Sequence, residues 1–272
     1  MGEDLQWIQV GSLAEELSEH VLPDSSDLGG RTIRLFFENG TATRIAFHDT
    51  HSLTWEVIKG DGKGARDDET YIATCPRQNV YFVDYIKHSD RATKISLVLD
   101  LESGIATAVS GTLPTEREAR SDPFRRVQAG KNLTAVDARF LSAAIDREFG
   151  ADERRHEPTA ELVGKRVKYV YSQKDTYEHI YLSEKFFTWH CLAGIEKGLA
   201  DTERCHHFKI DDELFLFVWR EKLIPTLGVV LIDLHKMKTT GMLFGYESQD
   251  FGKLTNVRIG AYAELIHVAK YG

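Results

Sequence analysis

Residues 54–69 read TWEVIKGDGKGARDDE, and residues 188–203 read TWHCLAGIEKGLADTE. The two stretches lie 134 positions apart and share seven of sixteen residues without a gap. The shared pairs are Thr54/Thr188, Trp55/Trp189, Gly60/Gly194, Lys63/Lys197, Gly64/Gly198, Asp67/Asp201 and Glu69/Glu203. A match of this quality predicts an internal duplication, which has to be recognised before single elements are assigned.

The duplication extends well beyond this block. The same offset pairs LGGRTIRLFF (28–37) with LVGKRVKYVY (162–171), and YFVDY (81–85) with FLFVW (215–219). One residue of slippage then aligns LVLDL (97–101) with VLIDL (230–234), after which Gly111 matches Gly245. Each copy therefore spans about 82 residues, 30–111 and 164–245.

Within each copy the apolar residues follow the pattern of short strands. Thr32, Arg34 and Phe36 alternate with Ile33, Leu35 and Phe37, a period of two that is typical of a strand. Asn39-Gly40 and Ser103-Gly104 are typical of turns between strands. Several short antiparallel strands would leave unpaired edges unless each sheet closed on itself. The sequence therefore predicts a mostly β protein with two tandem lipocalin-like antiparallel β-barrels, each able to hold one small ligand.

The segment between the copies, 114–158, has a different composition. Within it, TAVDARFLSAAIDREFG (134–150) has apolar residues at helical spacing, Thr134 as an N-cap and Gly150 at its end. This pattern predicts a connecting helix. The expected domains are 1–113, an N-terminal barrel with an N-terminal extension; 114–161, a helical linker; and 162–272, a C-terminal barrel.

Composition excludes several classes of protein. The 272-residue chain has a net charge of −8, and no basic run is long enough to follow a phosphate backbone, so we expect no nucleic-acid partner. The acidic N-terminus does not resemble a secretory signal, and no apolar run is long enough for a membrane helix. Three cysteines provide no disulfide framework. A cytoplasmic protein with no membrane partner is expected.

The sequence resembles the MoaF family, often labelled molybdenum cofactor biosynthesis protein F. The resemblance rests on TWHCLAGIEKGLADTERC, LFLFVWREKLIPTLGVVLIDL and MKTTGMLFGY in the second copy, and on YFVDYIKHSDRATKISLVLDLESGIATAVSG in the first. It implies tandem MoaF N-terminal and C-terminal domains with calycin-like barrels. A link to cofactor or amine metabolism is a further implication of the family label, and no residue of this sequence points to it.

The candidate catalytic residues are those at which the two copies differ. His190 aligns with Glu56, so neither identity is required for folding, and imidazole is suited to proton transfer near neutral pH. Arg220 and Glu221 align with Ile86 and Lys87. Alternation along the strand places Glu221 with the inward aromatic residues and Arg220 on the opposite face. Arg220 and Glu221 could instead form an ion pair at the barrel mouth. In an enzyme, Arg220 or Tyr169 could steady an anion.

The candidate ligand-binding residues are aromatic or soft side chains of the second copy: Trp189, Trp219, Phe217, Tyr171, Cys205 and His207. Aromatic rings at such density form a core and also suit stacking on a flat ligand. Cys205 and His207 share a strand face and could approach His190, but their spacing matches no zinc pattern, so no metal site is predicted.

Two classes of function remain. The first is an enzyme without a cofactor, of the lyase, decarboxylase or isomerase type, that acts by acid/base catalysis on a small aromatic or carbonyl compound. The second is a protein that binds or carries such a molecule without turnover. The expected partner is in both cases a small, aromatic ligand or substrate, with a homodimer as a further option. Paired titratable groups in a cavity would favour the enzyme, and a purely apolar cavity would favour the carrier.

Overall fold

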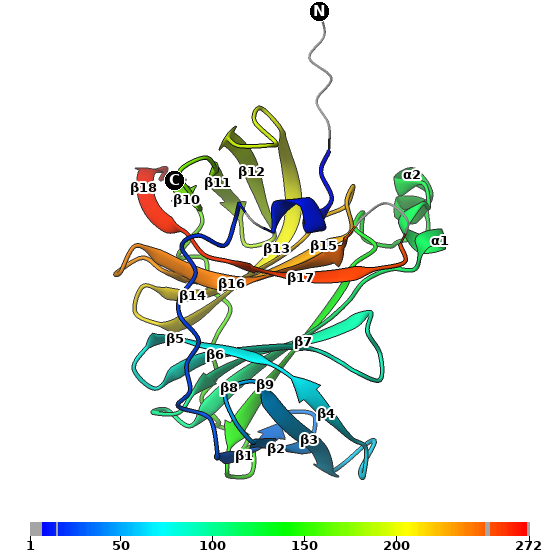
Figure 1. Cartoon of the computed structure of the whole chain (residues 1–272), viewed down its shortest axis with the longest axis vertical. Helices are drawn as coiled ribbons and strands as arrows, with labels where there is room; N and C mark the ends of the chain where they lie inside the picture. The colour runs from blue at the N-terminus through cyan, green and yellow to red at the C-terminus, as the bar shows by residue number, and fades with distance from the viewer. Residues whose placement is uncertain (1–6, 15, 248–250, 271–272) are drawn as a thin grey trace, which may run out of the picture. The chain divides into compact units, whose positions relative to one another are not determined.

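The computed structural model describes residues 7–14, 16–247 and 251–270. These residues divide into two compact units (Figure 1). The N-terminal unit comprises residues 22–112 and 138–157, and the C-terminal unit comprises the described residues of 1–21, 113–137 and 158–272. Each unit contains one antiparallel β-barrel, so the prediction of two tandem barrels is confirmed.

The N-terminal barrel is a nine-stranded sheet that nearly closes on itself. Its spatial order is β4 (Arg66–Thr70), β3 (Ser52–Lys59), β2 (Ala42–Phe47), β1 (Thr32–Phe37), β9 (Asp137–Ile145), β8 (Ile105–Thr112), β7 (Thr93–Asp100), β6 (Val80–Ile86) and β5 (Ile72–Arg77). The two outermost strands, β4 and β5, are separated in the chain only by Tyr71. Closure therefore results from a bend in one continuous run of extended chain.

The C-terminal barrel is also built on nine strands. These are β10 (Lys165–Val170), β11 (Thr176–Ser183), β12 (Phe186–Ala193), β13 (Ala200–Asp211), β14 (Leu214–Arg220), β15 (Thr226–Asp233), β16 (Lys238–Tyr246), β17 (Leu254–Ile259) and β18 (Tyr262–Val268). The barrel closes because β16 pairs with β15 on one side and with β17 on the other, while β18 continues from β17 and pairs with β10.

The strand boundaries repeat the offset found in the sequence. Strands β3 and β12 lie 134 residues apart at both ends, as do β6 and β14, whereas β7 and β15 lie 133 residues apart. The long strand β13 corresponds to β4 and β5 together. The duplication therefore applies to the positions of the elements as well as to the residues.

The helix predicted over 134–150 is wrong, because this region forms strand β9. Strand β9 pairs with β1, with Leu35 opposite Ile145 and Phe37 opposite Ala143, and it fills the gap between β1 and β8. This long-range pairing overrides an apolar spacing that suits a helix. The helices of the connecting segment precede it and are short: α1 (Glu116–Ala119) and α2 (Pro123–Gln128).

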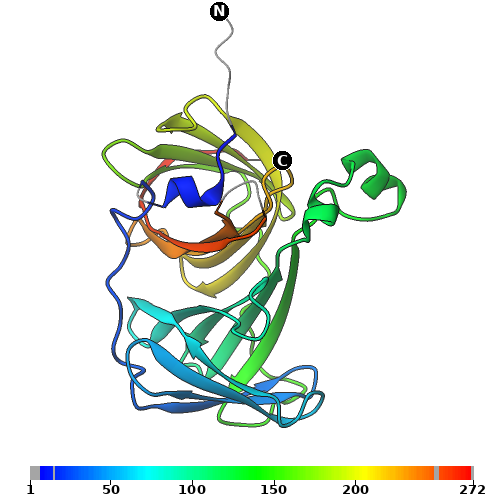
Figure 2. The same cartoon turned by 45° about the vertical axis from the view of Figure 1, so that its right-hand side comes forward.

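The compact units divide the chain differently from the expected domains, and the expected linker is split between them: residues 113–137 and 158–161 belong to the C-terminal unit. Residues 138–157, from the expected linker, belong to the N-terminal unit through β9. The described residues of 7–21, from the expected N-terminal extension, belong to the C-terminal unit. There a short 3-10 helix, η1 (Val10–Leu13), lies in the mouth of the barrel (Figure 2).

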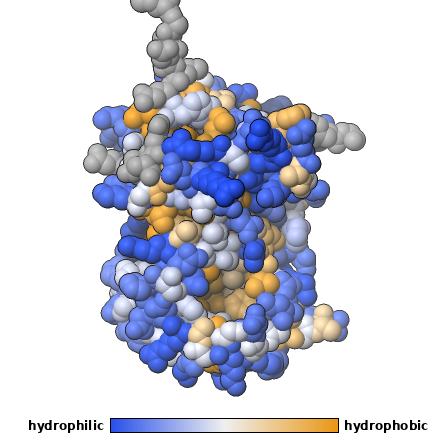
Figure 3. All heavy atoms as spheres, turned by 90° about the vertical axis from the view of Figure 1, so that its right-hand side faces the viewer, coloured by the Kyte–Doolittle hydropathy of each residue, from blue (hydrophilic) through white to orange (hydrophobic). Residues whose placement is uncertain are grey.

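The face of the molecule in Figure 3 is mostly hydrophilic, with apolar side chains gathered in smaller areas. No helix in the described ranges has both the length and the apolarity needed to cross a membrane.

Candidate functional site in the C-terminal barrel

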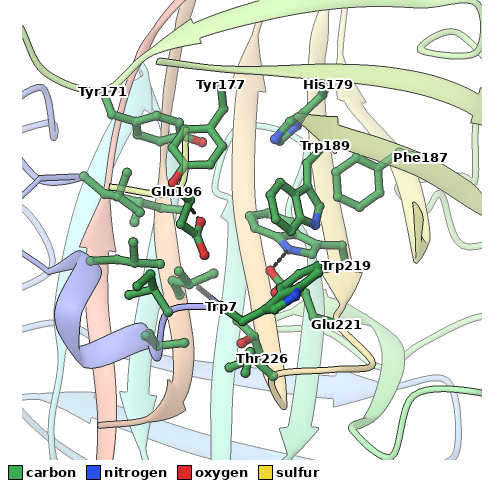
Figure 4. A pocket seen from close by; sticks show the side chains of 17 residues that line it. Trp7, Tyr171, Tyr177, His179, Phe187, Trp189, Glu196, Trp219, Glu221 and Thr226 are labelled. Carbon is green, nitrogen blue, oxygen red and sulfur yellow. Dashed lines mark hydrogen bonds between the residues drawn. The ribbon is translucent and has the colours of Figure 1, made fainter. Parts of the chain in front are cut away.

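A cavity lies inside the C-terminal barrel beneath η1. Its walls are mainly aromatic and aliphatic side chains, and their polar groups include two carboxyl groups, one imidazole and the hydroxyls of two tyrosines and one threonine (Figure 4). The lining residues are Trp7, Ile8, Val10, Leu13, Leu17, Tyr171, Tyr177, His179, Phe187, Trp189, Glu196, Trp219, Glu221, Ile224, Thr226, Leu243 and Ile259. The cavity thus combines an apolar wall with a few polar groups, as small-molecule sites do.

The cavity has a volume of about 50 Å³. A cavity of roughly 150 Å³ is needed to hold a molecule such as benzene, so this space has room for only a few water molecules. The N-terminal segment explains the small volume because it supplies five of the lining side chains. It also packs closely on the barrel: a Cβ atom added to Gly245 would lie 2.4 Å from Cγ2 of Val10.

Strand alternation decides which side chains enter the cavity. In β12, Phe187 and Trp189 face inward, and in β14 Phe217 and Trp219 do so, their rings stacked at 5.4 Å between centroids. Glu221 continues the inward row of β14 and lines the cavity, which is the orientation expected from the sequence.

Glu221 is a carboxyl group held by an indole. Nε1 of Trp219 donates a hydrogen bond of 3.0 Å to Oε1 of Glu221. Burial raises the pKa of Glu221 to about 8, and the nearby charges of Glu196 and Asp201 act in the same direction. The hydrogen bond from Trp219 and the charge of Lys222 oppose this shift. Around neutral pH the group is therefore mostly protonated.

Glu196 supplies the second carboxyl group from the loop between β12 and β13. The hydroxyl of Tyr177 donates a 2.9 Å hydrogen bond to its Oε2, and burial raises its pKa. The loop begins at Gly194, which has a φ of +123°. A Cβ atom at Gly194 would lie 1.9 Å from Oδ1 of Asp175, so the turn that presents Glu196 requires glycine there.

Trp189 brings an unused hydrogen-bond donor to the cavity. Its side chain is 6% exposed, and its Nε1 has no hydrogen-bond partner among the described residues. The equivalent residue of the N-terminal barrel, Trp55, donates from Nε1 to Oε1 of Glu69 at 3.0 Å. Trp7 packs edge-on against Trp189, with ring centroids 5.9 Å apart. The two copies therefore differ in whether the indole N–H of this tryptophan has a hydrogen-bond acceptor.

His179 completes the polar lining as a neutral group. Burial lowers its pKa to about 3, so the imidazole is uncharged across the physiological range. Its ring lies 5.0 Å from that of Phe187 between centroids. Lys222, whose positive charge acts on Glu221, does not line the cavity.

His190 lies on the outer face of the barrel. It follows the inward Trp189, and its Nδ1 contacts Oε1 of Glu178 at 2.8 Å. Glu178 also pairs with Arg166. The side chain of His190 is 37% exposed and does not line the cavity. The structure therefore separates the proposed catalytic pair of His190 and Glu221.

Arg220 and Tyr169 are also placed away from the cavity lining. Arg220 is buried on the outer side of β14, where its Nη1 donates to the carbonyl of Val136 at 3.2 Å. Tyr169 is buried in the barrel core, with its hydroxyl 2.8 Å from that of Tyr181. The hydroxyl of Tyr169 therefore has a partner in the core, whereas Nε of Arg220 has none in the described structure, although it lies outside the cavity lining.

The six expected ligand-binding residues divide evenly. Trp189, Trp219 and Tyr171 line the cavity, whereas Phe217, Cys205 and His207 pack in the core. Sγ of Cys205 lies 3.3 Å from Nε2 of His207. Burial raises the pKa of Cys205 to about 12 and lowers that of His207 to about 4. Within the described ranges, no three His, Cys, Asp or Glu side chains are grouped to hold a metal ion.

Several residues that line the cavity are not among those predicted from the sequence. Glu196 aligns with Gly62 at the 134-residue offset, so the comparison that singled out Glu221 could also have found it. Trp7 and the rest of the N-terminal segment lie outside the repeat. Apolar residues in that segment were the available signal, but nothing in the sequence indicates which barrel receives them.

The chain is similar to known proteins over its full length. The model of the MoaF N-terminal domain matches residues 5–115, and that of the MoaF C-terminal domain matches residues 156–269. Protein MoaF of Klebsiella aerogenes is 38% identical over 275 residues, which cover 100% of this chain and 99% of that protein. A solved structure from Burkholderia vietnamiensis, described as a candidate beta-lactamase, has a TM-score of 0.32 and 13% identity over 46% of this chain and 95% of its own.

Proposed function

Because the chain belongs to the MoaF family, and the name of its curated relative states no activity, we propose from the geometry that the C-terminal barrel binds a small aromatic molecule. The observation that carries this proposal is the position of Glu221. It is a carboxyl group placed among indole rings at the wall of an apolar cavity, where a core would need no such group.

The cost of burying Glu221 supports a ligand at this site. Burying a carboxyl group costs free energy unless it gains partners, and here the cost is visible as a pKa raised to about 8. The same position in the N-terminal barrel holds Lys87, whose Nζ lies 5.2 Å from the ring centre of Trp55. A stable barrel can therefore be built without a buried carboxyl group at this position.

Access requires a change at the N-terminal segment. The present volume of about 50 Å³ is too small for an aromatic ring, and Trp7 occupies the side of the cavity next to Trp189. Withdrawal of Trp7 would uncover the aromatic face of Trp189 for stacking. The N-terminal segment thus acts as a cover for the site.

Acid/base catalysis is the second candidate function. A carboxyl group with a pKa of about 8 is suited to proton transfer near neutral pH, and Glu196 provides a second carboxyl group in the same cavity. The proton-transfer pair would then be Glu221 and Glu196, since His190 lies outside. Such an enzyme would be of the lyase or isomerase type and would need no organic cofactor.

Binding can be tested with a set of small phenols, aryl ketones and arylamines, by tryptophan fluorescence of a Trp55→Phe variant. In that background the remaining tryptophans, Trp7, Trp189 and Trp219, all line the cavity. We expect a saturable change and a raised melting temperature with at least one compound class. Loss of the response in Glu221→Leu, but not in the matched Lys87→Leu, would place the site. No response in the whole set, also with Trp7→Ala, would contradict the proposal.

Catalysis can be tested separately. A compound that binds is incubated in deuterated water and examined by NMR for deuterium incorporation. The acid/base function predicts incorporation with the wild type and its loss in Glu221→Gln. Binding without incorporation or conversion would leave the protein as a carrier.

A further inference from the structure

The cavity contains donors that lack acceptors. The indole Nε1 of Trp189 can donate a hydrogen bond but cannot accept one. It has no partner within the described ranges, although Trp189 is only 6% exposed. Oγ1 of Thr226, which is 1% exposed, likewise has no partner within those ranges. Buried polar groups normally find partners, so these two atoms call for a ligand atom that accepts hydrogen bonds.

Glu221 adds a further donor. Its Oε1 accepts from Trp219, which leaves the acid proton to Oε2 when the group is neutral. Aromatic surroundings that keep a carboxylic acid protonated allow it to donate to a ligand oxygen. In Figure 4 the indole nitrogens of Trp189 and Trp219 and the carboxyl group of Glu221 lie on one side of the cavity.

We propose that the cavity recognises the oxygen of an aryl carbonyl compound through two hydrogen-bond donors, the Trp189 indole and the carboxyl group of Glu221. The inference rests on the proposed function, since it names the class of ligand for the same site. The aryl group would stack on the indole rings after Trp7 withdraws, and the carbonyl oxygen would satisfy Trp189.

The charges around Glu221 agree with a neutral or oxygen-rich ligand. The groups that face it from the neighbouring elements are His179 on β11, Glu196 on the β12–β13 loop, Asp201 and Glu203 on β13, and Lys222 after β14. His179 is neutral, and Glu203 has a pKa raised to about 9 by burial. Below about pH 8 both Glu203 and Glu221 are therefore mostly neutral, and Glu221 can act as a donor toward the cavity.

The test compares three compounds with the same skeleton of heavy atoms: acetophenone, cumene and 1-phenylethylamine. At one position they present a carbonyl oxygen, a methyl group or an ammonium group. Affinities are measured by calorimetry at about pH 6 and about pH 9 for the wild type, Trp189→Phe and Glu221→Gln, with Trp55→Phe as the matched control. Trp189→Phe keeps an aromatic ring and removes the donor.

We expect acetophenone to bind tightest at pH 6 and to lose about tenfold in affinity at pH 9, where Glu221 becomes an acceptor only. Trp189→Phe should lose about tenfold and Trp55→Phe nothing, because the Trp55 indole already donates to Glu69. Glu221→Gln keeps an N–H donor and should flatten the pH dependence. Equal binding of acetophenone and cumene would overturn the inference while upholding the proposed function. Preference for the amine, strengthening as pH rises, would also overturn it. Binding of none, with Trp7→Ala included, would refute both.

Discussion

Replacement of Glu221 by glutamine should make the C-terminal barrel more stable above neutral pH. The pKa of this carboxyl group is raised by burial from 4.5 to about 8 in the folded protein. Between these values the unfolded chain releases the proton and the folded protein keeps it, so stability falls as pH rises. The contribution of the neutral acid is fully present below about pH 4.5 and is lost as the pH passes through about 8.

The size of the effect follows from the shift. One pKa unit corresponds to about 1.4 kcal/mol, which sets an upper limit of about 5 kcal/mol for the cost of ionised Glu221 above pH 8. Part of the side chain remains exposed, and the cavity has room for a few waters that solvate the carboxylate. We therefore expect Glu221→Gln to gain about 1–3 kcal/mol at pH 9 and roughly nothing at pH 4.5.

Urea unfolding at a series of pH values measures this difference. The Trp55→Phe background makes tryptophan fluorescence a probe of the C-terminal barrel, because the other three tryptophans belong to that unit. Glu203→Gln is the matched comparison, since Glu203 has a pKa raised to about 9 but does not line the cavity. A stability difference between Glu221→Gln and wild type that stays constant with pH would refute a perturbed Glu221.

Three further changes test other parts of the structure. Trp7→Ala should lower the free energy of unfolding by about 1–2 kcal/mol, because the half-buried ring packs on Trp189. It should also speed ligand association in stopped-flow fluorescence, and an unchanged association rate would contradict the covering role of the N-terminal segment. Lys94→Met should lower the free energy of unfolding by about 3–5 kcal/mol, because it leaves buried Asp84 without the amine 2.9 Å away, and Lys94→Met/Asp84→Leu should recover most of this in urea titrations. His190→Ala should leave ligand affinity unchanged and shift the free energy of unfolding by less than about 1 kcal/mol, since the His190–Glu178 pair lies on the outer face. A loss of ligand binding would show that His190 belongs to the site after all.

The strands could be predicted because a pattern found in one copy can be checked at the equivalent positions of the other. The turn containing Gly194 and Gly198 recurs with Gly60 and Gly64, and it fixes the register of the strands on either side. Once the register is set, alternation assigns Glu221 to the inner face. The connecting segment had no second copy at the same offset. Its apolar spacing suits a helix, and only the gap in the barrel makes it β9.

The candidate site could be predicted only in part. Differences between the copies mark Glu221 and His190 equally, although one lines the cavity and the other lies outside it. The sequence already separates them, since His190 follows an inward tryptophan and Glu221 stands two residues after one. The contribution of Trp7 could not be predicted, because it depends on a contact between distant parts of the chain.

The two barrels differ at two equivalent positions, and this difference is the strongest reason to assign the working site to the second. In the N-terminal barrel, the Trp55 indole donates its hydrogen bond to Glu69, and Lys87 lies over its ring. This indole N–H therefore needs no ligand atom as a partner. In the second, the equivalent of Lys87 is Glu221 and the Trp189 indole is left without an acceptor in the described structure. A fold that can satisfy this tryptophan internally, and does so in one copy, leaves it open in the other at a cost in stability. Such a cost is expected where a ligand supplies the missing partner.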